Sequence, residues 1–321
     1  MLIGITGGAG YIGARLAGIL CGEGFRVRVL DDFSSSVPEG LHSIPVDLQE
    51  GDAAAPETAA RFMQGLDFLF DLSGVAEVTV SEANPGRCLR SNILARHTLV
   101  GAVPASLTGW LFPSSVSAVY GKPLFSPLNE WHPPQPSNLY GVSKLAAEQV
   151  LLAAYRGRKV PVVILRQSNV YGPSPSLKFD SVIPAFIRQA LTAGRLTVHG
   201  NGLQVRSFVH IEDLLDVYLK IMKLCLHGGT QASPAVIGRI YNIGGEESSI
   251  RELGALVAEA VESRTGKRIR IEIEAGRPGG VPEALNLSLH RIHQALGYRP
   301  TRRLRQAVAE LVELVAATST S

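Results

Sequence analysis

The sequence predicts an α/β fold with a doubly wound parallel sheet and a smaller C-terminal lobe. Short apolar runs of strand length alternate with helical apolar patterns through the first half of the chain. This alternation is typical of a parallel sheet with helices on both faces. A glycine-rich turn joins the first run to the first helix, and beyond residue 168 long irregular stretches interrupt short helices. We therefore expect a nucleotide-binding domain over 1–168 and a predominantly substrate-binding lobe over 169–321.

The composition suits a compact soluble protein, with 45% hydrophobic and 18% charged residues in a chain of 321. A formal net charge of +3 is too small to indicate a nucleic-acid partner. The cysteines at 21, 88 and 225 lack metal-ligand spacing, so no metal site is expected. Because no apolar run reaches ~18 residues and the chain begins with a strand, we expect no membrane span, no signal peptide and a cytoplasmic location.

The first 32 residues predict a complete strand, turn, helix and strand unit. Leu2–Thr6 is an apolar run that fits one buried strand, and a helical apolar pattern follows over Tyr11–Cys21. Arg26–Leu30 fits a second strand, which ends on Asp31 and Asp32. This order of elements is that of a Rossmann-type nucleotide-binding unit.

The glycine turn indicates that the bound nucleotide is NAD. Gly7 allows a tight turn, Gly10 lets the backbone approach a pyrophosphate, and Gly13 lets helix and strand pack closely. Asp31 lies 18 residues after Gly13, where an acid binds the adenosine ribose and repels a 2′-phosphate. Free N–H groups at the helix N-terminus favour the anion. The cofactor contacts in this unit are expected at Gly7, Gly10, Tyr11, Ile12, Gly13, Asp31 and Asp32.

Further strands and helices continue the alternation. A strand near Ser43–Val46 ends on Asp47 and Leu48, where an aspartate at the sheet edge would meet the adenine amino group. The remaining elements of this half are expected as a helix at 57–64, a strand at 66–72, a helix at 86–101, a strand at 109–114, a helix at 138–155 and a strand at 160–165. Leu72 and the small residues Ser73 and Gly74 end the 66–72 strand, where the cofactor can come close.

Tyr140 and Lys144 are the candidate catalytic pair. They are four residues apart in YGVSK, so a helix places both side chains on one face. An ammonium group beside a phenol favours the phenolate, as does the positive nicotinamide of NAD⁺. A phenolate near neutral pH can take a hydroxyl proton while hydride leaves the same carbon. The serine-rich end of the 109–114 strand offers hydroxyl groups to hold the substrate oxygen.

The sequence resembles the extended short-chain dehydrogenase/reductase family, in its nucleotide-sugar epimerase/dehydratase branch. The motifs that carry the resemblance are TGGAGYIG (6–13), Asp31, YGVSK (140–144), RQSNVYGP (166–173), VIPAFI (182–187), VHGNGLQVRSFVHIED (198–213), YNIGG (241–245) and GRPGGVPE (276–283). They span nearly the whole chain, and those after residue 181 are specific to the sugar-nucleotide branch.

The resemblance implies roles for residues outside the glycine turn. Asn169, Arg206 and Arg277 match family residues that bind the substrate diphosphate, and guanidinium forks suit phosphate oxygens. Val182, in the VIPAFI motif, is expected to contact the substrate as well. Asn92 matches a family asparagine that orients the cofactor side of the site.

Two departures from the family pattern affect the expected chemistry. Val116 stands where the family commonly has its catalytic Ser or Thr. A related reductase branch places that serine at the position of Ser115, which we take as the catalytic hydroxyl, with Ser117 as the second candidate. The 4,6-dehydratases carry an Asp–Glu pair where this chain has Ser117 and Ala118, and Gly280 replaces a family aspartate.

The resemblance implies an NAD-dependent 4-epimerase that acts through a 4-keto sugar. A UDP-hexose or UDP-N-acetylhexosamine is the expected substrate, because Ala284 matches a position beside the sugar C2 group, where a small residue admits an acetamido group. The alternatives are a 4-keto-sugar reductase, another 4-keto-dependent step such as dehydration, and a non-catalytic NAD-binding or redox-sensing protein. Family members commonly dimerise through two helices, here 86–101 and 138–156, with apolar Leu89, Ile93, Val150 and Leu151 on them.

Overall fold

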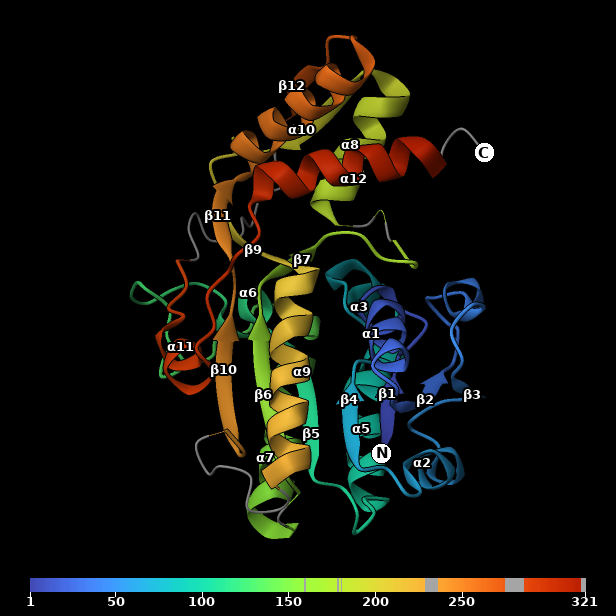
Figure 1. Cartoon of the computed structure of the whole chain (residues 1–321). Helices are drawn as coiled ribbons and strands as arrows, with labels where there is room; N and C mark the ends of the chain where they lie inside the picture. The colour runs from blue at the N-terminus through green and yellow to red at the C-terminus, as the bar shows by residue number, and fades with distance from the viewer. Residues whose placement is uncertain (159, 178, 180, 229–235, 275–285, 319–321) are drawn as a thin grey trace.

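The computed structural model describes the chain except residues 159, 178, 180, 229–235, 275–285 and 319–321. The strands of its central sheet are β1 (Leu2–Thr6), β2 (Arg26–Asp31), β3 (Asp47–Glu50), β4 (Phe68–Asp71), β5 (Gly109–Ser115), β6 (Val162–Gln167) and β10 (Arg239–Ile243). Seven parallel strands follow the order β10-β6-β5-β4-β1-β2-β3 (Figure 1). The strand order reverses between β1 and β4, as in a doubly wound sheet. The predicted fold class is confirmed.

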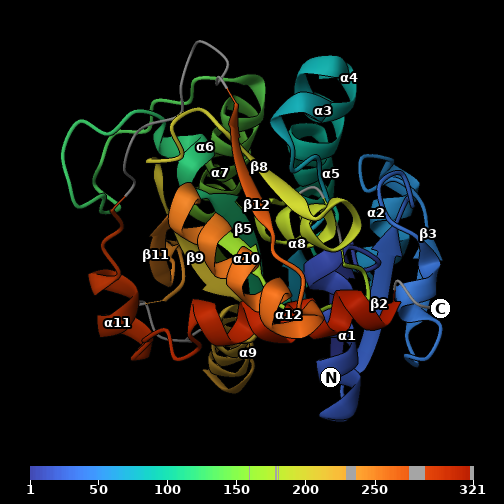
Figure 2. The same ribbon diagram turned by 90° about the horizontal axis from the view of Figure 1, so that it is seen from above.

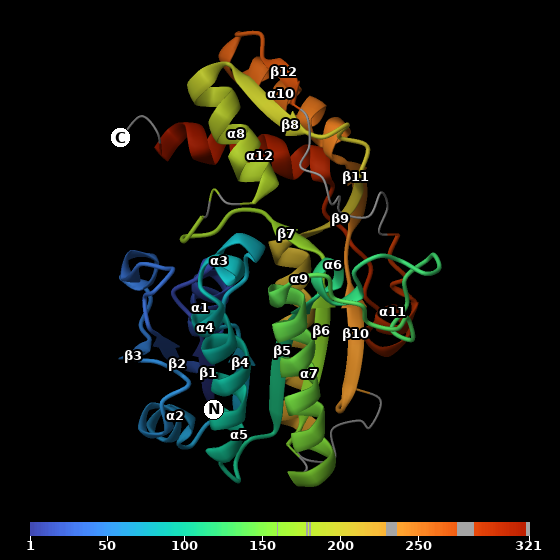
Figure 3. The ribbon, with the colours of Figure 1, turned by 180° about the vertical axis from the view of Figure 1, so that it is seen from behind.

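Helices cover both faces of this sheet. The helices on one face are α1 (Tyr11–Gly22), α9 (Ile211–Gly228) and α11 (His290–Leu296), which share a core with inward-facing residues of β1, β2, β4, β5, β6 and β10. On the other face lie α2 (Pro56–Met63), α5 (Ala95–Gly101) and α7 (Leu139–Arg158), and Figure 3 shows α5 and α7 in front of the strands. Alternate residues of the inner strands contribute to the two cores, which is why β1, β4, β5 and β6 read as mainly apolar runs, whereas the edge strand β3 is polar.

The segment between β4 and β5 differs from the single helix expected at 86–101. It contains α3 (Val78–Ala83), α4 (Pro85–Leu89), a π-helical turn η2 (Arg90–Leu94) and α5. Asn84 caps α4 by accepting a hydrogen bond from the Arg87 N–H at 3.0 Å, so α3 ends where α4 begins. Two short helices complete this half, η1 (Pro38–Leu41) and α6 (Val116–Tyr120).

The second lobe has a core of its own. Its strands are β7 (Asn169–Tyr171), β8 (Arg195–His199), β9 (Val205–His210), β11 (Glu246–Ser249) and β12 (Arg270–Glu274), arranged as a β11-β9-β7 sheet and a β12-β8 pair. The helices α8 (Val182–Ala193), α10 (Ile250–Thr265) and α12 (Leu304–Thr318) pack on these strands (Figure 2). A reciprocal pair of hydrogen bonds between Ser249 and Glu252 caps α10.

The central sheet crosses the boundary expected at residue 168. Strand β10 pairs with β6 in register Arg239↔Val163, and α9 packs against β4 and β5. The later half of the chain therefore supplies an edge strand and a covering helix to the nucleotide-binding sheet, as well as the lobe. Within the described residues, no helix is both long and apolar enough to span a membrane.

Candidate functional site

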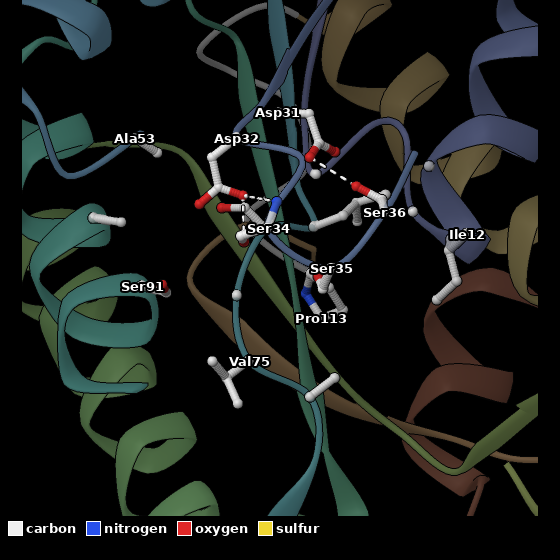
Figure 4. Close-up of a pocket in the computed structure, with 18 of the residues that line it drawn as sticks. Ile12, Asp31, Asp32, Ser34, Ser35, Ser36, Ala53, Val75, Ser91 and Pro113 are labelled. Carbon is white, nitrogen blue, oxygen red and sulfur yellow. Dashed lines mark hydrogen bonds between the residues drawn. The ribbon is translucent and has the colours of Figure 1, made fainter. Parts of the chain in front are cut away.

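A cavity of about 440 Å³ lies at the carboxyl ends of the strands, at the switch point between β1 and β4. It extends from the acids at the end of β2 to Tyr140 and Lys144 on α7 (Figure 4 shows the β2 end). The predicted residues that line it are Gly7, Gly10, Tyr11, Ile12, Gly13, Asp31, Asp32, Leu72, Ser73, Gly74, Tyr140 and Lys144. One continuous cavity thus joins both ends of the predicted NAD site.

The glycine turn has the geometry that a dinucleotide requires. Gly7 has φ +66°, and a Cβ there would lie 2.8 Å from the Ser73 backbone. A Cβ on Gly13 would overlap the Gly7 carbonyl oxygen. Gly10 caps α1 without a side-chain hydrogen bond, so backbone N–H groups of the first helical turn are left for an anion in the cavity. These residues fit a pyrophosphate.

Asp31 is held rigidly at the ribose end. Its carboxylate accepts hydrogen bonds of 2.9 Å from the Ala9 N–H, the Phe33 N–H and the Ser36 hydroxyl. Figure 4 shows Ser36 directed toward Asp31 and Ser34 toward Asp32. The acid therefore faces the cavity in a fixed position, and it also anchors the turn that follows β2.

The prediction for Asp47 and Leu48 rested on a strand end that the structure contradicts. β3 begins at Asp47 and continues to Glu50, so Asp47 lies at the opposite end of the strand from the cavity. Asp47 forms an ion pair with Arg28 at 2.7 Å instead. The residues after β3 that line the cavity are Gly51, Asp52 and Ala53. A polar strand, DLQE, carries no apolar run, which is why the sequence placed the strand too early.

Tyr140, Lys144 and Ser115 meet at the other end of the cavity. A hydrogen bond joins the side chains of Ser115 and Tyr140, and the Lys144 ammonium donates to the Pro113 carbonyl at 3.1 Å. Burial raises the pKa of Tyr140 to about 12, although the bond to Ser115 opposes this. Burial and the nearby Arg96 lower the pKa of Lys144 to about 8. Lys144 is not among the causes of the Tyr140 shift, so the expected lowering of the Tyr140 pKa by Lys144 is not seen in this structure.

The two candidate serines lie in different surroundings. Ser115 ends β5, is partly buried, and caps α6 by accepting from the Ala118 N–H at 3.4 Å. Ser117 is exposed on α6, and Val116 packs in a small cluster with Tyr120 and Leu128. Of the three residues 115–117, only Ser115 has a hydrogen bond to Tyr140 in the described structure.

Asn92 acts behind the cavity wall rather than in it. Its amide accepts from the Val75 N–H at 2.8 Å and donates to the Val75 carbonyl at 3.0 Å and to the Ser143 hydroxyl at 2.8 Å. It is 2% exposed. The side chain therefore joins the segment after β4 to helix α7.

The expected diphosphate residues lie in the lobe, on neighbouring strands. Asn169 is on β7, and its amide donates to the Ser207 carbonyl at 3.1 Å. Arg206 is on β9, is 8% exposed, and donates to the Val205 carbonyl at 2.7 Å. Val182 begins α8 beside Ser181, which lines the cavity. Arg277 and Ala284 lie outside the described residues.

The cavity also contains residues that the sequence reading did not single out. These are Leu30, Ser34, Ser35, Ser36, Gly51, Asp52, Ala53, Val75, Ala76, Glu77, Arg87, Ser91, Ala95, Pro113, Ser114, Gln167, Val170 and Ser181. Most lie at the carboxyl end of a strand or within a few residues after it, so the rule that ligands bind beyond the carboxyl ends of strands would have found them. Arg87 and Ser91 come from the α4–η2 segment and had no such signal.

Two UDP-glucose 4-epimerases are similar to this chain over nearly its whole length. The UDP-glucose 4-epimerase of Azospirillum brasilense is 31% identical over 313 residues, which cover 92% of this chain and 86% of that protein. The UDP-glucose 4-epimerase of Mycolicibacterium smegmatis is 30% identical, with 96% of each chain covered. The similarity therefore extends across both the nucleotide-binding half and the lobe.

Solved structures agree with this fold. A UDP-glucose 4-epimerase from Thermotoga maritima, solved with UDP-glucose, has a TM-score of 0.87 at 26% identity and covers 99% of each chain. A dTDP-glucose 4,6-dehydratase from Streptomyces venezuelae, solved with NAD, has a TM-score of 0.85 at 26% identity and covers 99% of this chain and 97% of that one. The family model described as the NAD dependent epimerase/dehydratase family matches residues 3–244. With NAD as its cofactor, this enzyme belongs to the NAD-dependent epimerase/dehydratase family.

Proposed function

We propose that the protein is a nucleotide-sugar 4-epimerase that acts on a UDP-hexose or a UDP-N-acetylhexosamine. The observation that carries this proposal is the hydrogen-bonded Ser115–Tyr140 pair beside Lys144, at the end of the same cavity that begins at Asp31. The two relatives described above, both named UDP-glucose 4-epimerase, support the reaction and the UDP group.

The side chains divide the chemistry between them. Tyr140 takes the proton of the sugar O4 hydroxyl and later returns it, and the Ser115 hydroxyl holds O4 by a hydrogen bond. Lys144 supplies the positive charge that favours the phenolate against the burial that raises the Tyr140 pKa. NAD⁺, when bound, would supply the reversible hydride acceptor that inversion at C4 through a 4-keto sugar requires. Asp31 would hold its ribose, and the glycine turn would hold its pyrophosphate.

The substrate diphosphate is assigned to the lobe. Arg206 and Asn169 come from paired strands β9 and β7, so the small sheet holds them at a fixed separation. Burial lowers the pKa of Arg206, yet a guanidinium remains charged near neutral pH. Arg277 is proposed as the second diphosphate arginine, and Val182 as a contact at the start of α8. Ala284 is proposed to leave room at C2 for an acetamido group.

Dehydration is disfavoured by the residues at the end of β5. Ser117 and Ala118 provide no carboxylate to protonate a leaving hydroxyl or to remove a neighbouring proton. One-way reduction of a 4-keto sugar is the second candidate, because Ser115 occupies the serine position of the reductase-like pattern. A non-catalytic NAD-binding protein would not need the buried Tyr140 and Lys144 pair.

A homodimer is part of the proposal. Leu89 on α4, Leu94 on η2 and Val142 on α7 are each more than 40% exposed, at 44%, 41% and 46%, on helices that contact one another. Leu151, one of the residues expected at this interface, is instead buried against its own sheet at 0% exposure. The α4–η2 and α7 surface is therefore the proposed contact, and light scattering at micromolar concentration tests it.

The decisive experiment is a substrate panel. The protein and NAD⁺ are incubated with UDP-, dTDP-, GDP- and CDP-sugars, and the C4 stereochemistry is followed by NMR. We expect C4 epimers of a UDP-sugar to interconvert without net change in NADH. Steady NADH consumption with a keto substrate would establish the reductase, a 4-keto-6-deoxy product the dehydratase, and no reaction with any sugar the non-catalytic alternative.

A further inference from the structure

A buried ion pair lies directly behind the nicotinamide end of the cavity. Arg96 on α5 and Asp71 at the end of β4 form a two-point pair, and their side chains are 1% and 0% exposed. Asp71 also accepts from the Thr6 hydroxyl at 2.7 Å and from the Trp110 indole N–H at 3.3 Å. Both carboxylate oxygens are therefore occupied by protein donors, as a buried charge requires.

The same guanidinium holds the cavity wall. We define the wall segment as residues 73–76, all of which line the cavity. Arg96 donates to the Ser73 carbonyl at 2.6 Å and to the Ser73 hydroxyl at 3.0 Å, and it also bonds the Ser91 carbonyl. Asn92 fixes Val75 from the same side, one helical turn before Arg96. The position of the wall therefore depends on a charged group that does not itself line the cavity.

Arg96 also lies close to Lys144. The Arg96 guanidinium is 5.4 Å and the Lys144 ammonium 4.9 Å from the centre of the same Phe112 ring. The groups that face Lys144 come from several elements: Asp71 of β4, Arg96 of α5, Glu148 of α7 and Cys88 of α4. Glu148 is itself paired with Arg166 of β6 at 2.7 Å. Because Arg166 offsets the charge of Glu148, Arg96 and Asp71 are the charged groups that act most strongly on Lys144.

An ion pair is a poor choice for stability at this position. Replacing a buried pair by apolar residues of similar volume is often neutral or stabilising, whereas removing one partner leaves an uncompensated buried charge and is strongly destabilising. A role in the site accounts for the pair better than a role in the core. We propose that Arg96 and Asp71 are positioning residues for the nicotinamide end of the cavity: Arg96 holds the wall segment and places a fixed positive charge beside Lys144, and Asp71 orients and partly offsets that charge.

The inference rests on the proposed role of Lys144, and its test does not require the sugar substrate. Lysine labelled with ¹³C at Cε reports the Lys144 titration by NMR in the protein without added sugar, with the signal assigned from Lys144→Met. Arg96→Gln removes a repulsive charge and should raise the Lys144 pKa from about 8 by about 1 unit. Asp71→Asn removes an attractive charge and should lower it by a similar amount. A merely structural role would not produce opposite shifts.

Two further variants separate charge from position and protect the test against misfolding. Arg96→Lys keeps the charge but loses the planar fork, so Lys144 should titrate near its wild-type value while NAD binds about tenfold more weakly in calorimetry. Asp71→Asn combined with Arg96→Gln leaves no unpaired charge, and its Lys144 pKa should lie between those of Arg96→Gln and Asp71→Asn. The control pair Arg264→Gln and Glu313→Gln, which breaks an exposed 2.8 Å ion pair in the lobe, should change neither quantity.

The decrease in turnover at high pH connects the Lys144 titration to function. Protonated Lys144 is the active form, so activity should fall as pH rises through its pKa, later in Arg96→Gln and earlier in Asp71→Asn. The inference would be overturned if Arg96→Gln and Asp71→Asn shifted the Lys144 pKa in the same direction, or if Arg96→Lys bound NAD as tightly as the wild type. It would also be overturned if the Lys144 pKa of the double variant were equal to or above that of Arg96→Gln. A wild type that transforms no nucleotide sugar would refute the proposed function instead, and the NMR shifts would still stand.

Discussion

The cofactor cavity and the second lobe build their binding groups in different ways. The cavity is made mainly of backbone and small residues at the ends of consecutive strands, so Gly7, Gly13 and Gly74 act by lacking a side chain. The proposed binding groups of the lobe are long side chains, such as Arg206, from strands that pair across more than thirty residues of sequence, for example Asn169 with Phe208. A backbone-built site is encoded in short motifs, whereas a side-chain-built site depends on how distant segments meet.

This difference predicts whether a single substitution will change turnover or ligand binding. Loss of a catalytic hydroxyl group should reduce turnover and leave binding intact, while changes in the lobe should weaken binding of the sugar nucleotide and leave NAD binding unchanged.

Tyr140→Phe should give the largest effect. Only the proton acceptor is lost, so turnover should fall at least ~10²-fold while NAD still binds. Pre-steady-state hydride transfer, followed by NADH absorbance, measures the loss, and calorimetry checks NAD. Turnover within a few-fold of the wild type would show that another group is the base.

Arg206→Gln tests the lobe. A charge-assisted guanidinium–phosphate interaction is worth ~1.5–3 kcal/mol, so KM for the nucleotide sugar should rise ~10- to 100-fold. The kcat and the NAD dissociation constant should change little. Arg264→Gln, at an exposed ion pair elsewhere in the lobe, is the matched control. A weaker NAD complex in Arg206→Gln would mean that the two regions are not separable as described.

Ser115→Ala and Ser117→Ala sharpen the comparison within the catalytic end. Ser115 is bonded to Tyr140 and Ser117 is exposed. Loss of the O4 contact at Ser115 should cost turnover ~10-fold or more, and Ser117→Ala should stay near wild type. Steady-state kcat for both variants, with thermal unfolding as a stability check, decides the assignment. The reverse ranking would make Ser117 the catalytic hydroxyl.

Asp31 tests the ribose end. The wild type should bind NAD at least ~10-fold more tightly than NADP, because its carboxylate repels a 2′-phosphate. Asp31→Asn should narrow that ratio, and it should also loosen the turn that Asp31 anchors through Ala9 and Ser36. Titration of both cofactors measures the ratio. Equal affinity of the wild type for the two would remove the ribose role.

Ala284→Tyr should have the smallest and most selective effect. A phenol ring at this position would fill the space proposed for the C2 acetamido group, so turnover of a UDP-N-acetylhexosamine should fall several-fold while the plain hexose is spared. Parallel assays with the two sugars measure selectivity. Equal losses for both, or none for either, would show that Ala284 does not control access at C2.

The sequence by itself determined the sheet, the glycine turn, the position of Asp31 at the end of β2, and the placement of Tyr140 and Lys144 on one face of a helix. Each depends on residues within one strand, one turn or one helix, where spacing alone fixes geometry. Asp47 was misplaced because β3 is polar and lacks the apolar run that marks the other strands.

Tertiary structure decided what no local pattern contains. The Arg96–Asp71 pair, the bond between Ser115 and Tyr140, and the joining of β10 to the first-half sheet all bring together segments that are distant in sequence. From sequence alone, an arginine on a helix is expected to be exposed to solvent, and only the tertiary packing shows that Arg96 is buried. A buried arginine requires charged and hydrogen-bonding partners, and the partners of Arg96 include Asp71 and Ser73 of the cavity wall.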